Sequence, residues 1–248
     1  MPFDVAIITA TFFEQDLLRR EMANTVVFNE ATKSYVSGSL GELNVVLVET
    51  GIGSVNCSHA LTQLFQKYDV SQVWQIGVGG AYPESGLSIG DLAIASTEHY
   101  GDIGVRMDRG WVGLEDSIEI PILTAEQNST NRSIFNRLDL DLAAAESAVK
   151  ILKKKWHTVV GPFVTVQECS GTDLLGKERG AFFSACCENM EGAAAAHICA
   201  IYDKKLFELR SMSNIVEARN KTEWDLSLAC RYAQEAIVTL ASEGFEIS

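Results

Sequence analysis

The fold of this chain is indicated most clearly by the stretch Val73-Trp74-Gln75-Ile76-Gly77-Val78-Gly79-Gly80-Ala81. Its first four residues are mostly apolar and predict a buried strand, and the glycines predict a loop at the strand's carboxyl end. A second junction of this kind joins the apolar run at 43–50 to Gly51-Ile52-Gly53 and a helical pattern at 54–67. Short apolar strands that alternate with helices are typical of an α/β protein with a largely parallel sheet.

The same alternation continues on both sides of this stretch. The pair 36–39 and 43–50, which turns at 40–42, predicts a hairpin and therefore a mixed sheet. Further strands are predicted at 5–8, 89–96, 158–166 and 206–211, and further helices at 14–22, 139–155, from 191 onward and at 222–242. With no repeat or low-complexity tract, we expect one domain over residues 1–248.

The amino-acid composition limits the kinds of molecule that the protein is expected to bind. The chain has 248 residues, of which 47% are hydrophobic, and its formal net charge of -13 argues against nucleic acid or an anionic membrane surface. There is no apolar run near the roughly 20 residues of a membrane span, and the start lacks the basic residues of a signal peptide. We therefore expect a cytoplasmic protein that binds a small molecule. Six cysteines without Cys-x-x-Cys spacing and four scattered histidines predict buried thiols and no metal site.

Ligands of open α/β sheets bind beyond the carboxyl ends of the strands, so the residues that follow each strand are the candidates for a site. Glu14 follows Phe12-Phe13, whose rings would desolvate the carboxylate and raise its pKa, as suits a general acid or base. A solvated acid in the first helical turn explains the same position equally well. Neither Gly-rich stretch is a nucleotide motif: Tyr82 replaces the third glycine of a dinucleotide fingerprint, and Gly51-Ile52-Gly53 lacks a P-loop ending.

Glu191 is the most unusual acid in the chain because it precedes four alanines in an apolar helix. An ionised Glu only accepts hydrogen bonds, so its natural ligand is a pair of hydroxyl donors, such as a ribose diol, or a cation. The alternative is an acid that complements the helix dipole.

Asn214 follows the predicted strand at 206–211 and offers an amide that donates and accepts at once. It suits a base that carries an exocyclic oxygen beside a ring nitrogen. The alternative is a turn asparagine that makes a local cap.

Together these residues resemble the nucleoside phosphorylase and nucleosidase superfamily, and within it the futalosine hydrolases of bacterial menaquinone biosynthesis. The resemblance runs over nearly the whole chain. It is carried by Ile7-Ile8-Thr9-Ala10 with Glu14, Glu49-Thr50-Gly51-Ile52-Gly53, Ile76-Gly77-Val78-Gly79-Gly80-Ala81-Tyr82, Ile89-Gly90-Asp91-Leu92, Tyr100-Gly101-Asp102, Ser170-Gly171-Thr172, Asn189-Met190-Glu191-Gly192-Ala193 and Ser213-Asn214.

The resemblance implies a three-layer α/β/α sandwich, a homodimer, and hydrolysis of a purine N-glycosidic bond without metal or organic cofactor. The expected products from futalosine are hypoxanthine and dehypoxanthinyl futalosine. Glu191 would accept hydrogen bonds from the ribose hydroxyls with Met190 under the sugar, and Glu14 would orient and deprotonate the attacking water. Asn214 would take the place of an aspartate that protonates adenine in methylthioadenosine and S-adenosylhomocysteine nucleosidases, which points to a 6-oxopurine.

The remaining expected contacts are less specific. Val78 and Gly79 would lie near the sugar, with Val78 where the adenosine-type enzymes carry a serine. The segment 163–172, beginning with Phe163, Val164 and Thr165, would line the base pocket. Arg106 and Arg109 are candidates for the carboxylated tail of futalosine, or are solvated loop charges.

Three alternatives remain beside the futalosine hydrolase. The chain could be a nucleosidase for methylthioadenosine, S-adenosylhomocysteine or aminodeoxyfutalosine. It could be a purine nucleoside phosphorylase, although no arginine adjoins either Gly-rich stretch to hold phosphate. It could also bind a nucleoside without catalysis, which the pair Glu14 and Glu191 disfavours.

Overall fold

A computed structural model describes residues 2–108, 110–127, 130–217, 220–245 and 247. Within these residues a ten-stranded sheet has the order β11-β6-β12-β13-β5-β1-β4-β3-β2, and β14 pairs with both β5 and β6. The strands of this sheet are β1 (Phe3–Thr9), β2 (Ala23–Glu30), β3 (Lys33–Leu40), β4 (Leu43–Glu49), β5 (Val70–Ala81), β6 (Leu92–Tyr100), β11 (Arg137–Asp139), β12 (Thr158–Thr165), β13 (Cys187–Asn189) and β14 (Lys205–Ile215).

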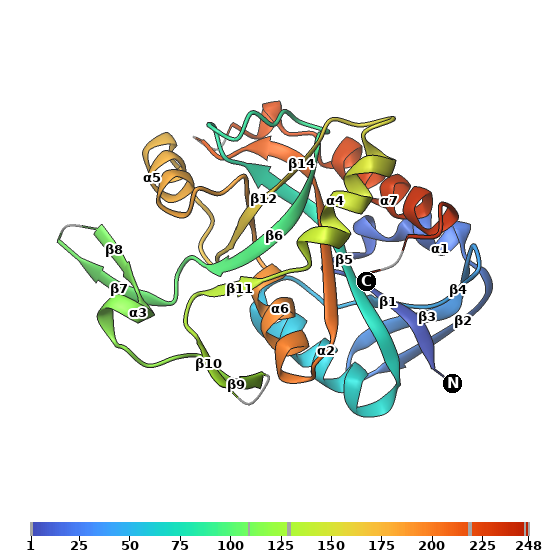
Figure 1. The fold of residues 1–248 in the computed structure, drawn as a ribbon. Coiled ribbons are helices and arrows are strands. Elements are labelled where there is room, and N and C mark those ends of the chain that lie inside the picture. Colours follow the sequence, from blue (N-terminus) through green and yellow to red (C-terminus); the bar gives the residue numbers. More distant parts are fainter. Residues whose placement is uncertain (1, 109, 128–129, 218–219, 246, 248) are drawn as a thin grey trace.

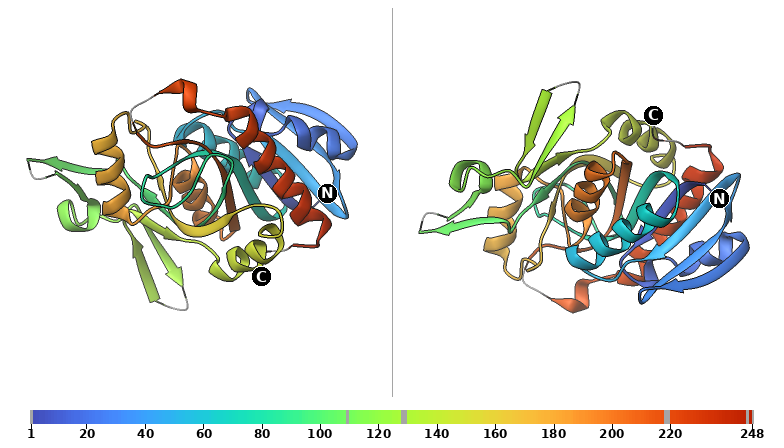
Figure 2. Two further views of the ribbon diagram at one scale, coloured as in Figure 1. Left: turned by 90° about the horizontal axis from the view of Figure 1, so that it is seen from above. Right: turned by 90° about the horizontal axis from the view of Figure 1, so that it is seen from below.

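The helices cover both faces of this sheet (Figures 1 and 2). They are η1 (Phe12–Glu14), α1 (Asp16–Glu21), α2 (Ser54–Lys67), α3 (Leu114–Ser117), α4 (Leu142–Leu152), α5 (Asp173–Phe183), α6 (Gly192–Ile201), η2 (Lys221–Glu223) and α7 (Leu226–Ser242). None of the described helices is long and apolar enough to cross a membrane. Two small hairpins stand apart from the sheet, β7 (Gly104–Met107) with β8 (Gly110–Gly113) and β9 (Leu123–Gln127) with β10 (Thr130–Ile134).

The side chains of β1 alternate between the two faces of the sheet, and this alternation shows how the three layers form. Val5 and Ile7 join the core cluster that contains α4 and α7, whereas Ala6 and Ile8 join the cluster that contains α2 and α6. Successive side chains of a strand point to opposite faces, so a strand that is apolar at every position is buried on both. β1 lies between β4 and β5 and is parallel to each, and β3 is antiparallel to β4. The predicted α/β/α sandwich with a mixed sheet is therefore confirmed.

The main correction concerns the glycines at 77–81. They do not form a loop but continue β5, which has β14 on one side along most of its length and β13 at its end. The ladder bonds to these two neighbours keep the backbone extended, although glycine is unfavourable in a strand. β14 also extends past the predicted boundary and includes Asn214.

Several elements gave no usable sequence signal. β2 is an edge strand whose side chains are almost all exposed, so it lacks an apolar alternation. The helix predicted at 222–242 begins only at Leu226, and the one predicted at 14–22 is divided into η1 and α1. Helix α5, which follows β12, was missed, and it borders the site described next.

Candidate active site

A cavity of about 860 Å³ lies at the carboxyl ends of β1, β5 and β14. Six sequence-predicted residues line it: Glu14, Val78, Gly79, Met190, Glu191 and Asn214. The other lining residues are Ala10, Thr11, Phe13, Asp16, Leu17, Arg20, Ile52, Gly80, Cys169, Ser170, Glu188, Asn189, Arg210, Ser213, Val216, Glu217, Trp224, Leu226, Ser227, Cys230, Arg231 and Gln234. The structure therefore brings both carboxylates and the amide to one cavity.

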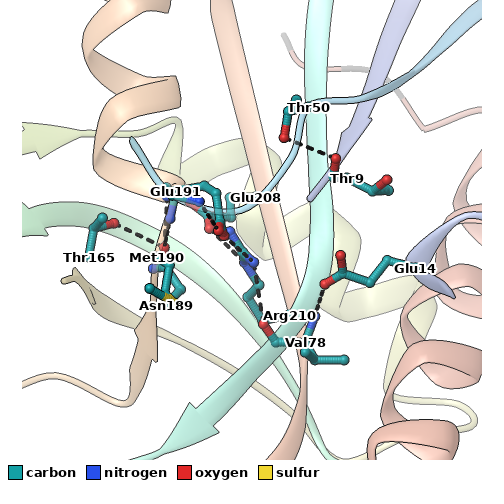
Figure 3. A network of polar contacts seen from close by, with 12 residues as sticks. Thr9, Glu14, Thr50, Val78, Thr165, Asn189, Met190, Glu191, Glu208 and Arg210 are labelled. Carbon is teal, nitrogen blue, oxygen red and sulfur yellow. Dashed lines mark hydrogen bonds and ion pairs between the residues drawn. The ribbon is translucent and has the colours of Figure 1, made fainter. Parts of the chain in front are cut away.

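Glu14 ends the short helix η1 and is 4% exposed. Its Oε1 accepts a hydrogen bond from Val78 N at 2.9 Å (Figure 3). Its Oε2 accepts from the Thr11 amide and hydroxyl, each at 2.9 Å. Gly77 makes this approach possible, because a Cβ there would lie 2.4 Å from Glu14 Oε1. Burial raises the pKa of Glu14, although the nearby Arg210 opposes that shift. A buried carboxylate of raised pKa is a candidate general base.

Glu191 stands at the N-cap of α6 but does not cap the helix with its side chain. Asn189 does so instead: its Oδ1 accepts from Glu191 N at 3.0 Å and from Gly192 N at 2.7 Å. The Glu191 carboxylate accepts from Gly53 N at 2.9 Å and from Arg210 Nη1 at 3.3 Å, and it lines the cavity. This placement disfavours the helix-dipole explanation and favours a role toward a ligand.

Arg210 is the central residue that the sequence analysis missed. It lies on β14, is 2% exposed, and donates from Nε to Glu208 Oε1 at 2.9 Å and from Nη1 to Glu191. The carboxylates of Glu208, Glu191 and Glu14 raise the pKa of Arg210, so it stays charged. The signal was an arginine inside the apolar strand pattern Leu206-Phe207-Glu208-Leu209-Arg210, since buried charges are normally paired.

A second carboxyl pair lies behind Arg210. Glu98 and Glu208 are both 0% exposed. Burial, and then the adjacent Glu208, raises the pKa of Glu98 well above its usual value, which favours its protonated form. Gly192 leaves both carboxyl groups space, because a Cβ there would lie 2.0 Å from Glu98 Oε1 and 2.5 Å from Glu208 Oε2.

Asn214 lines the cavity further along β14 than Arg210, at the place where β14 pairs with Gly80 of β5. Its Oδ1 accepts from the Ser213 hydroxyl at 2.9 Å, and its Nδ2 donates to Ile215 O at 2.9 Å. Ser170, which belongs to the segment 163–172 expected to line the base pocket, does line the cavity, and so does Glu188, which was not predicted.

Phe163, Val164 and Thr165 do not line the cavity, contrary to the sequence-based expectation. They are fully buried in β12, and the chain reaches the cavity only beyond that strand, at Cys169 and Ser170. Thr165 supports the site from behind: its hydroxyl bonds to Glu98 at 2.8 Å and to Asn189 at 3.0 Å. A strand residue just before the carboxyl end packs in the core, whereas residues after it face the ligand.

The cysteines and acids make no metal site among the residues that the structure describes. Four cysteines are buried, while Cys169 and Cys230 lie on the cavity wall. The rim of the cavity carries the cations Arg20 and Arg231. Arg106 lies on β7 and does not line the cavity, and Arg109 is outside the described residues.

Comparison with known proteins identifies the family of this chain. The Phosphorylase superfamily matches residues 4–242. A 5'-methylthioadenosine/S-adenosylhomocysteine nucleosidase of Halalkalibacterium halodurans is 27% identical over 240 residues, which are 97% of each chain. The futalosine hydrolase of Thermus thermophilus is 30% identical over 198 residues, which cover 80% of this chain and 81% of that protein.

Solved structures of the same kind share the fold. The 5'-methylthioadenosine/S-adenosylhomocysteine nucleosidase of Neisseria meningitidis, in complex with methylthio-immucillin-A, has a TM-score of 0.80 at 21% identity and covers 97% of this chain and 99% of its own. A futalosine hydrolase mutant of Helicobacter pylori strain 26695 has a TM-score of 0.80 at 17% identity, with the same coverage. Fold and relatives together define an N-glycosyl hydrolase of the nucleosidase type. The chain belongs to the Phosphorylase superfamily.

Proposed function

We propose that this enzyme hydrolyses the N-glycosidic bond of futalosine and releases hypoxanthine and dehypoxanthinyl futalosine. One observation carries the proposal: the neutral amide of Asn214 lines the same cavity as the carboxylates Glu14 and Glu191. The 30% identity to the futalosine hydrolase of Thermus thermophilus supports it.

The charged end of the cavity suits the sugar. Glu191 is held by Gly53 N and Arg210, and its remaining lone pairs can accept from the 2'- and 3'-hydroxyls of a ribose. Cleavage of a purine N-glycosidic bond develops positive charge on the sugar ring, which neighbouring carboxylates stabilise. Glu14, fixed by Val78 N and Thr11, would take the proton of the attacking water.

The end of the cavity that holds Asn214 suits a 6-oxopurine. The Asn214 amide can donate to the acceptors O6 and N7, which lie side by side on hypoxanthine. Adenine presents a donor at its 6-position and gains most from a group that can protonate N7. An amide can donate a hydrogen bond but cannot transfer its proton to the leaving base. Asn214 therefore favours a base that leaves readily without a strong acid.

Water, rather than phosphate, is the proposed nucleophile. Arg210 is committed to three carboxylates, and Glu14 and Glu191 would repel an anion beside the sugar. Among the described lining residues, the other cations are Arg20 and Arg231, and both are on the rim rather than near Glu14's carboxylate network. A phosphorylase would need a fixed cation at the reacting carbon.

The rim suits a large 5'-substituent. Cavities for drug-sized ligands are about 300–1,000 Å³, and this one lies in the upper part of that range. Apolar residues Phe13 and Leu226 lie there with the arginines at positions 20 and 231. An aromatic group with a carboxylate, such as the futalosine tail, fits that combination. We therefore propose that Arg20 and Arg231, rather than Arg106, contact the carboxylate of the 5'-substituent.

One assay tests the function and its alternatives. We would incubate the enzyme with futalosine, its 6-amino analogue aminodeoxyfutalosine, inosine and methylthioadenosine, with and without phosphate, and identify the released base by chromatography. The proposal expects hypoxanthine from futalosine at a rate that phosphate does not change. Turnover that requires phosphate would indicate a phosphorylase. Faster release of adenine from methylthioadenosine would favour the activity that names two of the four relatives described above.

A further inference from the structure

Gln234 is a polar residue on the buried face of α7. It is 1% exposed, and the other buried residues of this helix are all alanine, isoleucine or leucine. A buried amide costs free energy unless its groups are hydrogen-bonded, whereas an apolar side chain in the same place would carry no such requirement. The partners of the Gln234 amide therefore indicate what it contributes.

The side-chain oxygen of Gln234 caps another helix. Oε1 accepts from Leu17 N at 2.7 Å and from Leu18 N at 3.2 Å, and these are the second and third residues of α1. They are the amides that an N-cap side chain normally binds. The residue at the N-cap itself, Gln15, makes no such bond. Gln234 thus caps α1 although it lies near the other end of the sequence.

The side-chain nitrogen of Gln234 binds the segment just before that first turn. Nε2 donates to Phe13 O at 3.1 Å, to Asp16 Oδ1 at 3.2 Å and, within α7, to Cys230 O at 2.9 Å. The Phe13 carbonyl belongs to the peptide bond that joins Phe13 to Glu14. One buried amide therefore holds the main chain directly before Glu14 and again in the first turn of α1.

Glu14 is consequently fixed at two places. Its carboxylate accepts from Val78 N of β5 (Figure 3), and the turn that carries it lies against α7, which packs on both η1 and α1 (Figure 1). The bonds from Thr11 to Glu14 lie within that same turn and do not fix it to the rest of the fold. A general base must lie within hydrogen-bond reach of its proton, and a misplacement of about 1 Å can cost about 10²-fold in rate.

We propose that Gln234 is a positioning residue that fixes the turn carrying the general base Glu14. This inference rests on the proposed role of Glu14 but not on which nucleoside is cleaved. Gln234 acts through the main chain of η1 and α1 and does not need to touch a reacting atom. Loss of its amide should leave the substrate contacts of Glu191 and Asn214 in place and slow the chemical step.

The test is Gln234→Met, which keeps the approximate length of the side chain and removes the amide. The substrate is futalosine, or methylthioadenosine if the wild type cleaves it faster. We expect kcat and kcat/KM to fall together by about 10- to 100-fold, as displacement of a general base implies. An unchanged kcat would overturn the proposal.

The matched control is Gln72→Met. Gln72 is also buried, and its Oε1 accepts from Trp74 Nε1 at 3.0 Å and from Ile247 N at 3.1 Å, but it does not line the cavity. Both variants lose hydrogen bonds to buried groups, so both should have a lower Tm. Only Gln234→Met should lower kcat. An equal fall of kcat in the two variants would show that Gln234 has a structural role alone.

A double variant separates positioning from a general loss of structure. Once Glu14→Gln has removed the base, the position of that side chain matters little, so adding Gln234→Met should lower kcat by less than about threefold more. A further fall as large as in the wild-type background would contradict action through Glu14. If Glu14→Gln keeps wild-type activity, the proposed role of Glu14 has failed. If Glu14→Gln is inactive but Gln234→Met is not, only the inference about Gln234 has failed.

A second variant is available if Gln234→Met does not fold. Gln234→Asn keeps an amide in the core but is one methylene too short to bind Phe13 O and Leu17 N as glutamine does. We expect kcat to fall while calorimetry with hypoxanthine gives the wild-type affinity, because the base contacts are unaltered. Wild-type kcat in Gln234→Asn would contradict the proposal.

Discussion

The two ends of the cavity are built in different ways. At the proposed sugar end, Arg210 is surrounded by Glu14, Glu191 and Glu208, all nearly or fully buried. At the proposed base end, the cavity wall has the amide of Asn214 and the buried carboxylate of Glu188, which forms an ion pair with Arg179. The sugar end supplies chemistry that any nucleoside would require. The base end decides which base leaves. Substitutions at the sugar end should therefore lower activity, whereas substitutions at the base end should change the preference for the base.

The largest expected effect is at the sugar end. Glu14→Gln keeps the shape of the side chain but cannot accept a proton from water, so kcat should fall about 10²- to 10⁴-fold. Steady-state kinetics on futalosine measure this loss, and calorimetry should show that substrate still binds. Activity within a few fold of the wild type would remove Glu14 from the mechanism.

Arg210→Met should be the most damaging change to stability. It leaves Glu191 and Glu208 buried without their cation, and removing one partner of a buried ion pair costs about 3–5 kcal/mol. Urea denaturation measures the change in the free energy of unfolding. The matched control is Arg137→Met, which breaks an exposed pair with Asp139 and should cost at most about 1 kcal/mol. Equal losses for the two variants would show that the buried network does not stabilise the fold.

A smaller effect is expected at the base end. Asn214→Asp introduces a group that can hold a proton near N7, so the ratio of kcat/KM for futalosine over aminodeoxyfutalosine should fall about 10- to 100-fold. Competition between the two substrates, with the released bases quantified, gives this ratio directly. The sugar end is untouched, and the variant should remain an active hydrolase. A variant that keeps the wild-type ratio would show that Asn214 does not select the base.

The smallest expected effect is on the pH dependence of activity and stability. Because burial raises the pKa of Glu14 above the usual 4.5, the acid limb of kcat/KM should lie above pH 4.5. A raised pKa means that the folded protein binds the proton of Glu14 more tightly than the unfolded chain does. The stability that protonated Glu14 contributes is therefore present below pH 4.5 and is lost as pH rises through the raised pKa. Glu14→Gln should therefore gain stability relative to the wild type between pH 4 and pH 7. An acid limb at or below pH 4.5 would contradict the assignment.

Much of the sugar end was predictable from sequence, whereas of the base end mainly Asn214 was. Glu14 and Asn214 were predicted because each polar residue follows an apolar strand, and such positions meet at one edge of a sheet. Glu191 was predicted because it precedes four alanines in an apolar helix. Glu188 gave no such signal because β13 has only three residues, and no pattern can be recognised over that length. Arg179 was hidden because helix α5 was not predicted.

Glycine misled the sequence analysis in one place. Gly77 and Gly80 were interpreted as a loop, since glycine normally weakens a strand. In the structure their lack of a side chain serves the site: Gly77 admits the Glu14 carboxylate, and Gly80 leaves room for the side chain of Val216, which lines the cavity. Only the neighbouring strands show this, because the need for space comes from residues distant in the sequence.

The central claim is that a nucleosidase cavity with an amide at its base end hydrolyses a 6-oxopurine nucleoside. The most direct measurement mixes equal amounts of futalosine and aminodeoxyfutalosine with the wild-type enzyme in phosphate-free buffer and follows both free bases over time. The account predicts hypoxanthine in excess over adenine by about 100-fold or more, because a base with mismatched hydrogen-bonding groups leaves buried polar groups unpaired. Equal release of the two bases, or an excess of adenine, would contradict it.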